Sequence, residues 1–457
     1  MNIAGEKLDK SLSWKGQPRL YIETYGCQMN VNDSEIVAAL LQGQGFGITQ
    51  EPTEADLIFI NTCSIRDNAE QRVRGRLEVF RQYKKKKPEL IVGVIGCMAE
   101  RLREQLLEQE KMVDMVVGPD AYRDLPHLIQ LAGTGQKAVN VQLSREETYE
   151  EIQPVRLDTN HVSAFVSIMR GCNNMCAYCV VPYTRGAERS RNPKTILEEI
   201  AQLDHEQYRE VTVLGQNVNS YLWKGGEGEM DFPRLLEVIA TRFPGLRIRF
   251  STSHPKDLSD RLLETIAAHP NLCKSIHLPV QSGSSSILRA MKRGYSREEY
   301  MERLASIKRI LPEASISTDI IAGFCGETEE DHRETLSLMQ WAGYDFAFMF
   351  KYSERPGTYA SRKLKDDVTE EVKARRLDEI IHLQNKLSAA SKKNDVGQTF
   401  EVLVEGTSRR SKEELFGRTS QNKVVVFPKG NCQPGDLIRV RITRHTPATL
   451  IGEIVYL

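Results

Sequence analysis

The chain has 457 residues, of which 40% are hydrophobic and 27% are charged, and its formal net charge is zero. This composition argues against a disordered chain, and no apolar run approaches the roughly 20 residues that cross a bilayer. Nine cysteines are too few, and odd in number, for a disulfide scaffold, so we expect a cytoplasmic protein. The length predicts two to four domains.

Residues 18–133 alternate strand-like and helical patterns. Apolar runs at 20–27, 55–63 and 90–97 each end in a cysteine, and helical periodicity occupies 34–44 and 70–83. A β-α-β-α-β order predicts parallel strands with right-handed crossovers, and continuous apolar runs are typical of buried parallel strands. We therefore predict an α/β protein whose N-terminal domain contains a parallel sheet.

The cysteines that end these runs are Cys27, Cys63 and Cys97. The carboxyl ends of parallel strands meet at one edge of a sheet, where open α/β sheets bind their ligands. We therefore expect three thiolates to meet at that edge and to hold a metal cluster. The alternative is ordinary buried cysteine, since free cysteine packs as a small hydrophobic residue, but three cysteines at equivalent strand ends fit that alternative poorly.

Residues 134–160 are polar and lack periodicity, which predicts a linker. Strand and helix then alternate six times in a segment that we place at 158–390. The expected strands are 162–169, 210–216, 247–252, 275–280, 315–321 and 345–352, and the expected helices include 194–205, 231–243, 297–311, 329–341 and a long helix at 369–393. Six βα units predict a partial (β/α)6 barrel with its active site at the carboxyl ends of the strands.

The first barrel strand is followed by Cys172, Cys176 and Cys179, which lie within eight residues. Iron–sulfur clusters are normally held by four cysteines, so three thiolates can bind three irons of a cube and leave the fourth iron open. The C-x3-C-x2-C spacing is similar to that of radical S-adenosylmethionine (SAM) enzymes, in which SAM takes the open iron. The alternative is a zinc knuckle, but zinc prefers paired C-x2-C ligands with a further Cys or His, and upstream only His161 is a candidate.

The last segment, 393–457, changes in character. Strand-like runs at 399–404, 414–419, 423–427, 436–442 and 450–455 are separated by Gly and Pro. This pattern predicts a small antiparallel β-barrel. Such barrels commonly bind RNA, although a purely structural appendage fits the pattern equally well.

Four motifs carry a resemblance to a known family: TYGCQMNVNDSE at 24–35, NTCSIRDNAE at 61–70, VPYTRGAERSR at 181–191 and LGQNVNSY at 214–221. With the order of the predicted domains, they make the chain resemble the radical SAM methylthiotransferases over nearly its whole length. The motifs look like those of the branch that adds a methylthio group to C2 of N6-isopentenyl(dimethylallyl)adenosine at position 37 of tRNA.

The resemblance implies two 4Fe-4S clusters, SAM, and a C-terminal TRAM domain that helps to hold RNA. It assigns Cys172, Cys176 and Cys179 to the cluster that cleaves SAM to a 5′-deoxyadenosyl radical, which removes hydrogen from adenine C2. The auxiliary cluster, on the other three cysteines, supplies sulfur, and a second SAM supplies the methyl group. Since the cofactors carry these steps, we expect no catalytic residue beyond the cluster ligands.

For SAM itself, Tyr178 lies between two cluster ligands and is a candidate to pack on adenine, with a loop-core aromatic as the alternative. Gln216 and Asn217 end the second strand, where many radical SAM enzymes carry a Gly-Gly-Glu motif that grips the SAM amino group. The chain departs from that motif, so their role is inferred from position.

Three further residues are candidates for the same ligand. Gln281 and Asp319, at or near the ends of the fourth and fifth strands, are suited to amine, carboxylate or ribose groups, with a strand-end cap as the alternative. Arg185 follows the cysteine loop and is a candidate for the SAM carboxylate or an RNA phosphate, with a plain ion pair as the alternative. Cys273, Cys325 and Cys432 have no partner pattern and are interpreted as packing thiols.

The expected partners are a tRNA anticodon loop and an electron donor such as flavodoxin or ferredoxin, with the protein itself a monomer away from membranes. Residues 66–87 contain nine Lys or Arg against three Asp or Glu, and residues 391–457 contain eleven against seven. Such excesses can supply phosphate contacts, although a charged run is often a solvated helix face. A single-stranded loop lets the target base be splayed out at modest cost.

Three rival functions stay open. Sister methylthiotransferases act on threonylcarbamoyl-adenosine in tRNA or on an aspartate of a ribosomal protein, and the motifs around Cys27 and Cys63 argue against both. A non-catalytic iron–sulfur electron carrier bound to RNA is the third, although a carrier needs no SAM-binding barrel.

Overall fold

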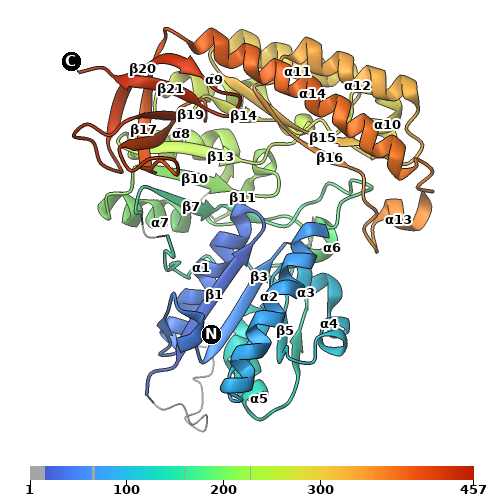
Figure 1. Cartoon of the computed structure of the whole chain (residues 1–457), viewed down its shortest axis with the longest axis vertical. Coiled ribbons are helices and arrows are strands. Elements are labelled where there is room, and N and C mark those ends of the chain that lie inside the picture. Colours follow the sequence, from blue (N-terminus) through green and yellow to red (C-terminus); the bar gives the residue numbers. More distant parts are fainter. Residues whose placement is uncertain (1–15, 64–66, 159, 227, 457) are drawn as a thin grey trace. The chain divides into compact units, whose positions relative to one another are not determined.

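A computed structural model describes residues 16–63, 67–158, 160–226 and 228–456. The chain folds into two compact units, and Figure 1 shows their elements. Unit 1 contains the residues up to 157 together with 167–173 and 180–196, whereas unit 2 contains 158–166, 174–179 and 197–457. Within the described ranges, no helix has both the length and the apolar character that a bilayer crossing requires.

Unit 1 is built on a six-stranded sheet in the order β2-β1-β3-β4-β5-β6. Every neighbouring pair of strands is parallel. The strands are β1 (Arg19–Tyr25), β2 (Gly47–Ile48), β3 (Leu57–Thr62), β4 (Ile91–Ile95), β5 (Met115–Val117) and β6 (Ala138–Asn140), and the helices are α1 (Gln28–Gly43), α2 (Asp67–Lys86), α3 (Cys97–Leu102), α4 (Glu104–Gln109) and α5 (Leu125–Gly133). The parallel sheet predicted for the N-terminal part is therefore confirmed.

Both faces of this sheet are buried. Phe59 of β3 belongs to an apolar cluster with Val37 of α1, whereas Ile60 belongs to a second cluster with Leu77 and Phe80 of α2. Alternate side chains of one strand thus enter two different cores, and this is why the strand is apolar at consecutive positions.

The prediction that residues 134–160 form a linker is wrong. Ala138–Asn140 form the edge strand β6, which pairs with β5. Tyr149 is buried, and its ring stacks on Tyr122 with 5.7 Å between centroids. Arg156 makes a buried ion pair with α1. A three-residue strand is too short to show a periodicity, so the polar composition of this segment concealed its packing.

Unit 2 contains the six strands expected of the partial barrel. They form two sheets, in the orders β13-β10-β7 and β14-β15-β16. The strands are β7 (Ser163–Ser167), β10 (Glu210–Leu214), β13 (Arg247–Ser251), β14 (Ser275–His277), β15 (Ser315–Ala322) and β16 (Phe346–Lys351), and the main helices are α7 (Pro193–His205), α8 (Phe232–Arg242), α9 (Asp260–Ala268), α10 (Ser285–Ala290), α11 (Arg297–Ile310), α12 (Glu329–Ala342) and α14 (Glu370–Asp395).

The C-terminal strands close into a barrel in the order β17-β18-β19-β21-β20. They are β17 (Thr399–Thr407), β18 (Glu414–Thr419), β19 (Val424–Pro428), β20 (Leu437–His445) and β21 (Leu450–Ile454). The predicted small barrel is thus confirmed, with one difference, because β19 and β21 pair in parallel. Its core contains Val402, Val425, Phe427 and Val440.

The turn between β18 and β19 packs against β13 and β15 of unit 2. Arg249 of β13 donates from Nη2 to the backbone oxygen of Thr419 at 2.7 Å and from Nη1 to that of Ser420 at 3.1 Å. Ser315, which begins β15, donates to the backbone oxygen of Gln421 at 2.6 Å. The C-terminal barrel is therefore attached at the middle of β13 and at the first residue of β15.

Candidate active site

Three cysteines lie at the carboxyl edge of the sheet in unit 1. Cys27 follows β1 as the N-cap of α1, Cys63 follows β3, and Cys97 begins α3 directly after β4. Because β1, β3 and β4 are parallel neighbours, the topology brings three thiols that are distant in sequence to one edge of the sheet.

Two glycines let these cysteine loops approach one another. Gly26 has a φ of 125°, and a Cβ added to it would lie 2.5 Å from Cβ of Cys63. Gly96 has a φ of 89°, and a Cβ there would lie 2.4 Å from Oδ1 of Asn61. Only glycine fits such close approaches at positive φ, which explains the Gly-Cys pairs at 26–27 and 96–97.

Buried amides support the loop of Cys27. The Cys27 thiol donates to Oδ1 of Asn30 at 3.2 Å, and Nδ2 of Asn30 donates to Oδ1 of Asn61 at 2.8 Å. Nδ2 of Asn61 donates back to the backbone oxygen of Asn30 at 2.8 Å. Since buried amides are costly unless they are hydrogen-bonded, this pairing holds the first turn of α1 against the end of β3.

The surroundings adjust the acidity of two of the thiols. A hydrogen bond from Cys63, helped by the charge of Arg185 and opposed by burial, lowers the pKa of Cys27 to about 6. Burial raises the pKa of Cys97, and the charge of Arg185 opposes that effect. The thiolate is the form that ligates metal, and the lowered pKa of Cys27 favours that form.

Arg185, the last residue of α6 (Val181–Arg185), reaches the same edge. Its Nε donates to Sγ of Cys97 at 3.2 Å, and its Nη2 donates to Oδ2 of Asp33 at 2.7 Å. The other oxygen of Asp33 accepts from Nη1 of Arg170 at 2.8 Å. The side chains of Arg170, Arg185 and Asp33 are 1%, 3% and 0% exposed. Two guanidinium groups therefore share one buried carboxylate beside Cys97.

These charges stay ionised in the folded protein. Burial alone would raise the pKa of Asp33, but the guanidinium groups of Arg170 and Arg185 hold it below its ordinary value. Arg189 pairs with Asp120 at 2.8 Å and donates from Nη2 to the backbone oxygen of Arg185 at 3.0 Å. The contact of Arg185 with SAM stays a prediction, and its described partners correspond to the ion-pair alternative.

Asp33, Arg170 and Asp120 were not among the candidates expected from the sequence. A signal for the first was present, because residues 30 and 32–35 of α1 are all polar and yet all buried. A run of polar residues in a helix that directly follows a candidate ligand indicates a functional edge, since such residues are seldom buried without partners.

Cys176 and Cys179 lie in unit 2, whereas Cys172 lies in the part of the loop that belongs to unit 1. Nη1 of Arg293 donates to Sγ of Cys176 at 3.2 Å, and its Nη2 donates to the backbone oxygen of Pro279 at 2.9 Å. Arg293 is 6% exposed and was not singled out from the sequence. A buried cation thus contacts a candidate ligand in unit 2 as in unit 1.

Tyr178 packs inside the cysteine loop. Its hydroxyl accepts from Nη1 of Arg293 at 3.4 Å, and its ring meets Phe324 edge-on with 6.4 Å between centroids. The neighbouring residue Ala177 donates its N–H to Met291 at 2.8 Å and accepts from Ala360 at 2.7 Å. These contacts correspond to the loop-core alternative for Tyr178, and its contact with SAM stays a prediction.

Gln216 and Asn217 follow β10 at the carboxyl end of the barrel. Asn217 is 1% exposed, and its Nδ2 donates to Oδ2 of Asp257 at 2.7 Å. Oε1 of Gln216 and Oδ1 of Asn217 are buried and accept no hydrogen bond within the described residues. Two orphaned acceptors at this place suit a ligand with a cationic donor, such as the ammonium group of SAM.

Gln281 and Asp319 belong to neighbouring segments. Gln281 has a φ of 76°, and its N–H donates to the backbone oxygen of Asp319 at 2.8 Å. Asp319 lies within β15, and its Oδ1 is 3.4 Å from Nε2 of His277 on β14. The structure thus brings the two candidates together by their backbones, and their contacts with SAM stay predictions.

One face of β15 and β16 is open. Asp319 is in register with Phe348, and Phe346 and Phe348 are 50% and 45% exposed, with their rings 4.9 Å apart. Ile320 and Ala347, which point to the other face, are buried. An exposed aromatic surface therefore lies beside Asp319 on this side of the sheet.

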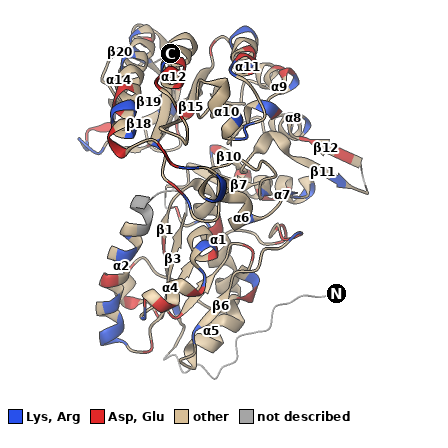
Figure 2. Cartoon of the chain, turned by 90° about the vertical axis from the view of Figure 1, so that its right-hand side faces the viewer, with Lys and Arg blue, Asp and Glu red and all other residues tan. Residues whose placement is uncertain are grey.

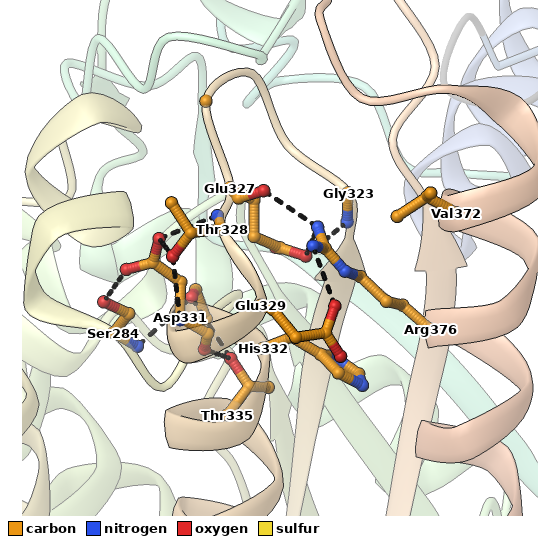
Figure 3. Close-up of polar contacts among 12 residues, drawn as sticks. Ser284, Gly323, Glu327, Thr328, Glu329, Asp331, His332, Thr335, Val372 and Arg376 are labelled. Carbon is orange, nitrogen blue, oxygen red and sulfur yellow. Dashed lines mark hydrogen bonds and ion pairs between the residues drawn. The ribbon is translucent and has the colours of Figure 1, made fainter.

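The loop after β15 is fixed by buried charges (Figure 3). Oε1 of Glu327 accepts from the N–H of Gly323 at 3.0 Å and from Nη1 of Arg376 of α14 at 3.0 Å. Asp331 accepts from Ser284 at 2.6 Å and from the hydroxyl of Thr328 at 2.6 Å. These contacts tie β15, α10, α12 and α14 together and give the carboxyl edge of the barrel a rigid rim.

The donors fit iron–sulfur clusters better than a single metal ion. Among the described residues, no three His, Cys, Asp or Glu side chains converge to hold one ion. A cube does not need such convergence, because each thiolate binds a different iron. Three thiols at one sheet edge supply the ligand type that such a cluster requires.

Several of the basic residues at 66–87 form ion pairs within unit 1. Arg76 pairs with Glu23 at 2.7 Å, and Lys87 pairs with Asp56 at 2.6 Å. Arg74, Arg81 and Lys84 are also ion-paired. Figure 2 shows acidic and basic residues together along α2. The pairing corresponds to the alternative of a solvated helix face, and contact of this helix with tRNA stays a prediction.

Three family models match the chain. Residues 19–118 match the uncharacterized protein family UPF0004, residues 166–339 match the radical SAM superfamily, and residues 393–455 match the TRAM domain. Among solved structures, the radical SAM methyltransferase TsrM from Kitasatospora setae, with cobalamin and a 4Fe-4S cluster bound, superposes with a TM-score of 0.57 at 15% identity, over 76% of this chain and 77% of that one. The barrel and its cysteine loop thus define a radical SAM enzyme.

Curated relatives cover nearly the whole chain. A tRNA-2-methylthio-N(6)-dimethylallyladenosine synthase from Bacteroides fragilis is 59% identical over 448 residues, 98% of each chain. One from Phocaeicola vulgatus is 60% identical over 449 residues, again 98% of each chain. The chain belongs to the family of tRNA-2-methylthio-N(6)-dimethylallyladenosine synthases.

Proposed function

We propose that the protein converts N6-isopentenyl(dimethylallyl)adenosine at position 37 of tRNA to its 2-methylthio derivative, as a radical SAM methylthiotransferase. The observation that carries the proposal is the identity of 59% and 60% to named synthases over 98% of the chain. Membership in the radical SAM superfamily implies one 4Fe-4S cluster and SAM, and we assign that cluster to Cys172, Cys176 and Cys179.

A second 4Fe-4S cluster on Cys27, Cys63 and Cys97 completes the proposal. Its support is the meeting of the three cysteines at one sheet edge and the glycines that let the cysteine loops approach one another. When bound, the two clusters and SAM supply the radical, the sulfur atom and the methyl group. The residues of the chain bind these groups, orient them and keep water out.

Gln216 and Asn217 are proposed to bind the ammonium group of SAM. Both present buried oxygen atoms without a donor, and an unpaired buried acceptor costs about 1–3 kcal/mol until it is satisfied. A cationic donor removes that cost, so the ammonium group of SAM satisfies both acceptors when SAM binds.

The open face of β15 and β16 is proposed to receive the modified base. Phe346 and Phe348 offer apolar surface for the dimethylallyl group, and Asp319 with His277 offers polar atoms beside it. A hydrophobic surface next to a few polar groups is the usual composition of a small-molecule site. The base is splayed from a single-stranded loop, where unstacking is inexpensive.

The TRAM barrel is proposed to contact tRNA through β20. Arg439, Arg441 and Arg444 of this strand are exposed. Each phosphate that a cation neutralises adds close to one unit, or somewhat less, to the salt dependence of binding. The combined Arg439→Glu and Arg441→Glu change should therefore weaken tRNA binding and lower the salt slope by about one to two. Arg409→Glu, in an exposed loop, is the matched control.

The proposed partners are tRNA and a small electron-transfer protein such as flavodoxin or ferredoxin, and the enzyme is proposed to act as a monomer. A reductant is required because SAM cleavage consumes an electron. Sedimentation of the anaerobic protein with and without tRNA tests the monomer, and replacement of chemical reductant by purified flavodoxin tests the donor.

Anaerobically reconstituted protein, supplied with SAM and reductant, tests the function on three substrates: isopentenylated tRNA, threonylcarbamoylated tRNA and the ribosomal protein that the sister enzymes modify. We expect 2-methylthio product only from the first, measured by mass spectrometry of the digested nucleosides. Product from either of the others would identify a sister activity. Absence of SAM cleavage by the reduced protein would favour an electron carrier.

A further inference from the structure

Among the described residues of unit 1, the buried arginines Arg170, Arg185 and Arg189 form ion pairs with two carboxylates. Arg170 and Arg185 share Asp33, and Arg189 pairs with Asp120. Three positive charges against two negative charges leave one buried positive charge without a carboxylate among these contacts. A buried charge is costly unless it is compensated.

Of these three arginines, Arg185 is the one that donates a hydrogen bond to a cysteine. Its Nε donates to Sγ of Cys97 at 3.2 Å, while Arg170 and Arg189 donate to carboxylates and backbone oxygens instead. A guanidinium group cannot lose its proton in a protein, so the group that balances it must be an anion. The thiolates of a cluster site are such an anion.

Arg185 is also held in place. Asp33 fixes its Nη2 at 2.7 Å, and Nη2 of Arg189 fixes its backbone oxygen at 3.0 Å. Because the guanidinium is planar and rigid, fixing one nitrogen sets the direction of the others. The N–H that meets Cys97 is therefore oriented before any cluster binds.

We propose that Arg185 is a positioning residue of the auxiliary cluster, which orients the Cys97 ligand by a charge-assisted hydrogen bond and raises the reduction potential of the cluster. The inference rests on the cluster that the proposed function assigns to Cys27, Cys63 and Cys97. Hydrogen bonds to ligand sulfur and nearby charge are two of the means by which proteins set such potentials, and groups that orient a ligand are as important as the ligand itself.

The test uses full-length protein in which Cys172, Cys176 and Cys179 are replaced by Ala, so that every signal comes from the auxiliary site. We expect about four irons in this parent. Arg185→Gln removes both the positive charge and the hydrogen bond to Cys97, whereas Arg185→Lys keeps the charge. Arg170→Gln is the control, because Arg170 pairs with the same Asp33 but its hydrogen bonds go to Asp33 and Pro119. Redox titration followed by electron paramagnetic resonance gives the midpoint potential and the spectrum of each reduced variant.

We expect the potential to shift to more negative values in Arg185→Gln, less in Arg185→Lys and least in Arg170→Gln, with a changed spectrum in both Arg185 variants. The positioning role is also supported if the Arg185 variants lose iron while Arg170→Gln keeps it, provided that circular dichroism shows that every variant is folded. Equal shifts or equal iron losses at Arg170 and Arg185, or unchanged potentials, would overturn it. A parent without iron would instead refute the auxiliary cluster of the proposed function.

Discussion

Nη1 of Arg293 lies 3.2 Å from Sγ of Cys176, and the same side chain reaches the hydroxyl of Tyr295 at 2.9 Å and the backbone oxygen of Pro279 at 2.9 Å. The cysteine loop of unit 2 is therefore anchored through one ligand sulfur to the segment around β14. This contact is independent of the one that Arg185 makes in unit 1, and it has its own consequence for cluster retention.

Arg293→Met should weaken the hold of this loop on iron. The change removes the hydrogen bonds from Arg293 to Cys176, Tyr295 and Pro279, and a hydrogen bond to a charged group contributes about 1.5–3 kcal/mol. In protein that carries Cys27→Ala, Cys63→Ala and Cys97→Ala, we expect less bound iron and slower SAM cleavage. Lys292→Met is the control, because the exposed Lys292 contacts the ring of Tyr359 and no cysteine. Equal iron content in both variants would contradict the anchoring.

Gln216→Ala should weaken SAM binding. An acceptor that meets a charged donor contributes about 1.5–3 kcal/mol, which corresponds to a dissociation constant higher by about 10- to 100-fold. Equilibrium binding of SAM to reconstituted protein measures the effect. Gln202→Ala, on the exposed surface of α7, should leave the constant unchanged. If both variants bind SAM like the parent, Gln216 makes no contact with it.

Phe348→Ala should reduce the preference for prenylated tRNA. Loss of an apolar contact costs about 1–3 kcal/mol of discrimination, so the ratio of kcat/KM for isopentenylated over unmodified tRNA should fall by about tenfold or more. Trp341→Ala is the control, since Trp341 is 43% exposed and lies on α12. A ratio that is unchanged in Phe348→Ala, with turnover retained, would remove the aromatic face from the substrate site.

Glu100→Gln should stabilise the protein above neutral pH. Burial raises the pKa of Glu100 to about 7, whereas an unfolded glutamate ionises near pH 4.3. The folded form keeps its proton longer, so stability is unaffected below about pH 4, falls as pH rises toward 7, and stays reduced above it. At about 1.4 kcal/mol per pKa unit, the gain at pH 8 is at most about 4 kcal/mol. Urea unfolding at pH 5 and pH 8 measures it, with the exposed Glu104→Gln as control.

Arg249→Ala should loosen the C-terminal barrel. The side chain of Arg249 is 10% exposed and joins Glu210 to the turn at 419–420. We expect a lower midpoint of thermal unfolding and faster proteolysis near residue 396. Deletion of 395–457 would uncover the same buried arginine, so loss of tRNA binding after that deletion would not by itself identify an RNA contact. Arg444→Ala, which is exposed, should leave the midpoint unchanged.

The sequence predicted those parts of the site that local patterns encode. Apolar runs that end in Cys27, Cys63 and Cys97 are enough to place three thiols at one edge, because parallel topology follows from the alternation of strand and helix. The six strands of unit 2 and the small C-terminal barrel follow from periodicity in the same way. The loop at 172–179 carries its own signature.

The buried charges were beyond local patterns. Asp33 and Arg185 are 152 positions apart, and no periodicity links them. Nor does composition reveal that β6 completes the sheet or that the turn after β18 sits on β13. Each of these depends on which surfaces meet in the folded chain, and tertiary contacts of this kind leave no mark in a window of a few residues.

The docking of residues 419–421 has a consequence for biosynthesis. The acceptors for Arg249 and Ser315 are translated more than a hundred residues after those side chains. In a nascent chain, Arg249 and Ser315 therefore lack these acceptors until residues 419–421 have emerged from the ribosome. Premature termination before residue 419 would leave a protein with all six candidate cluster cysteines but without the contacts that Arg249 and Ser315 make with this turn.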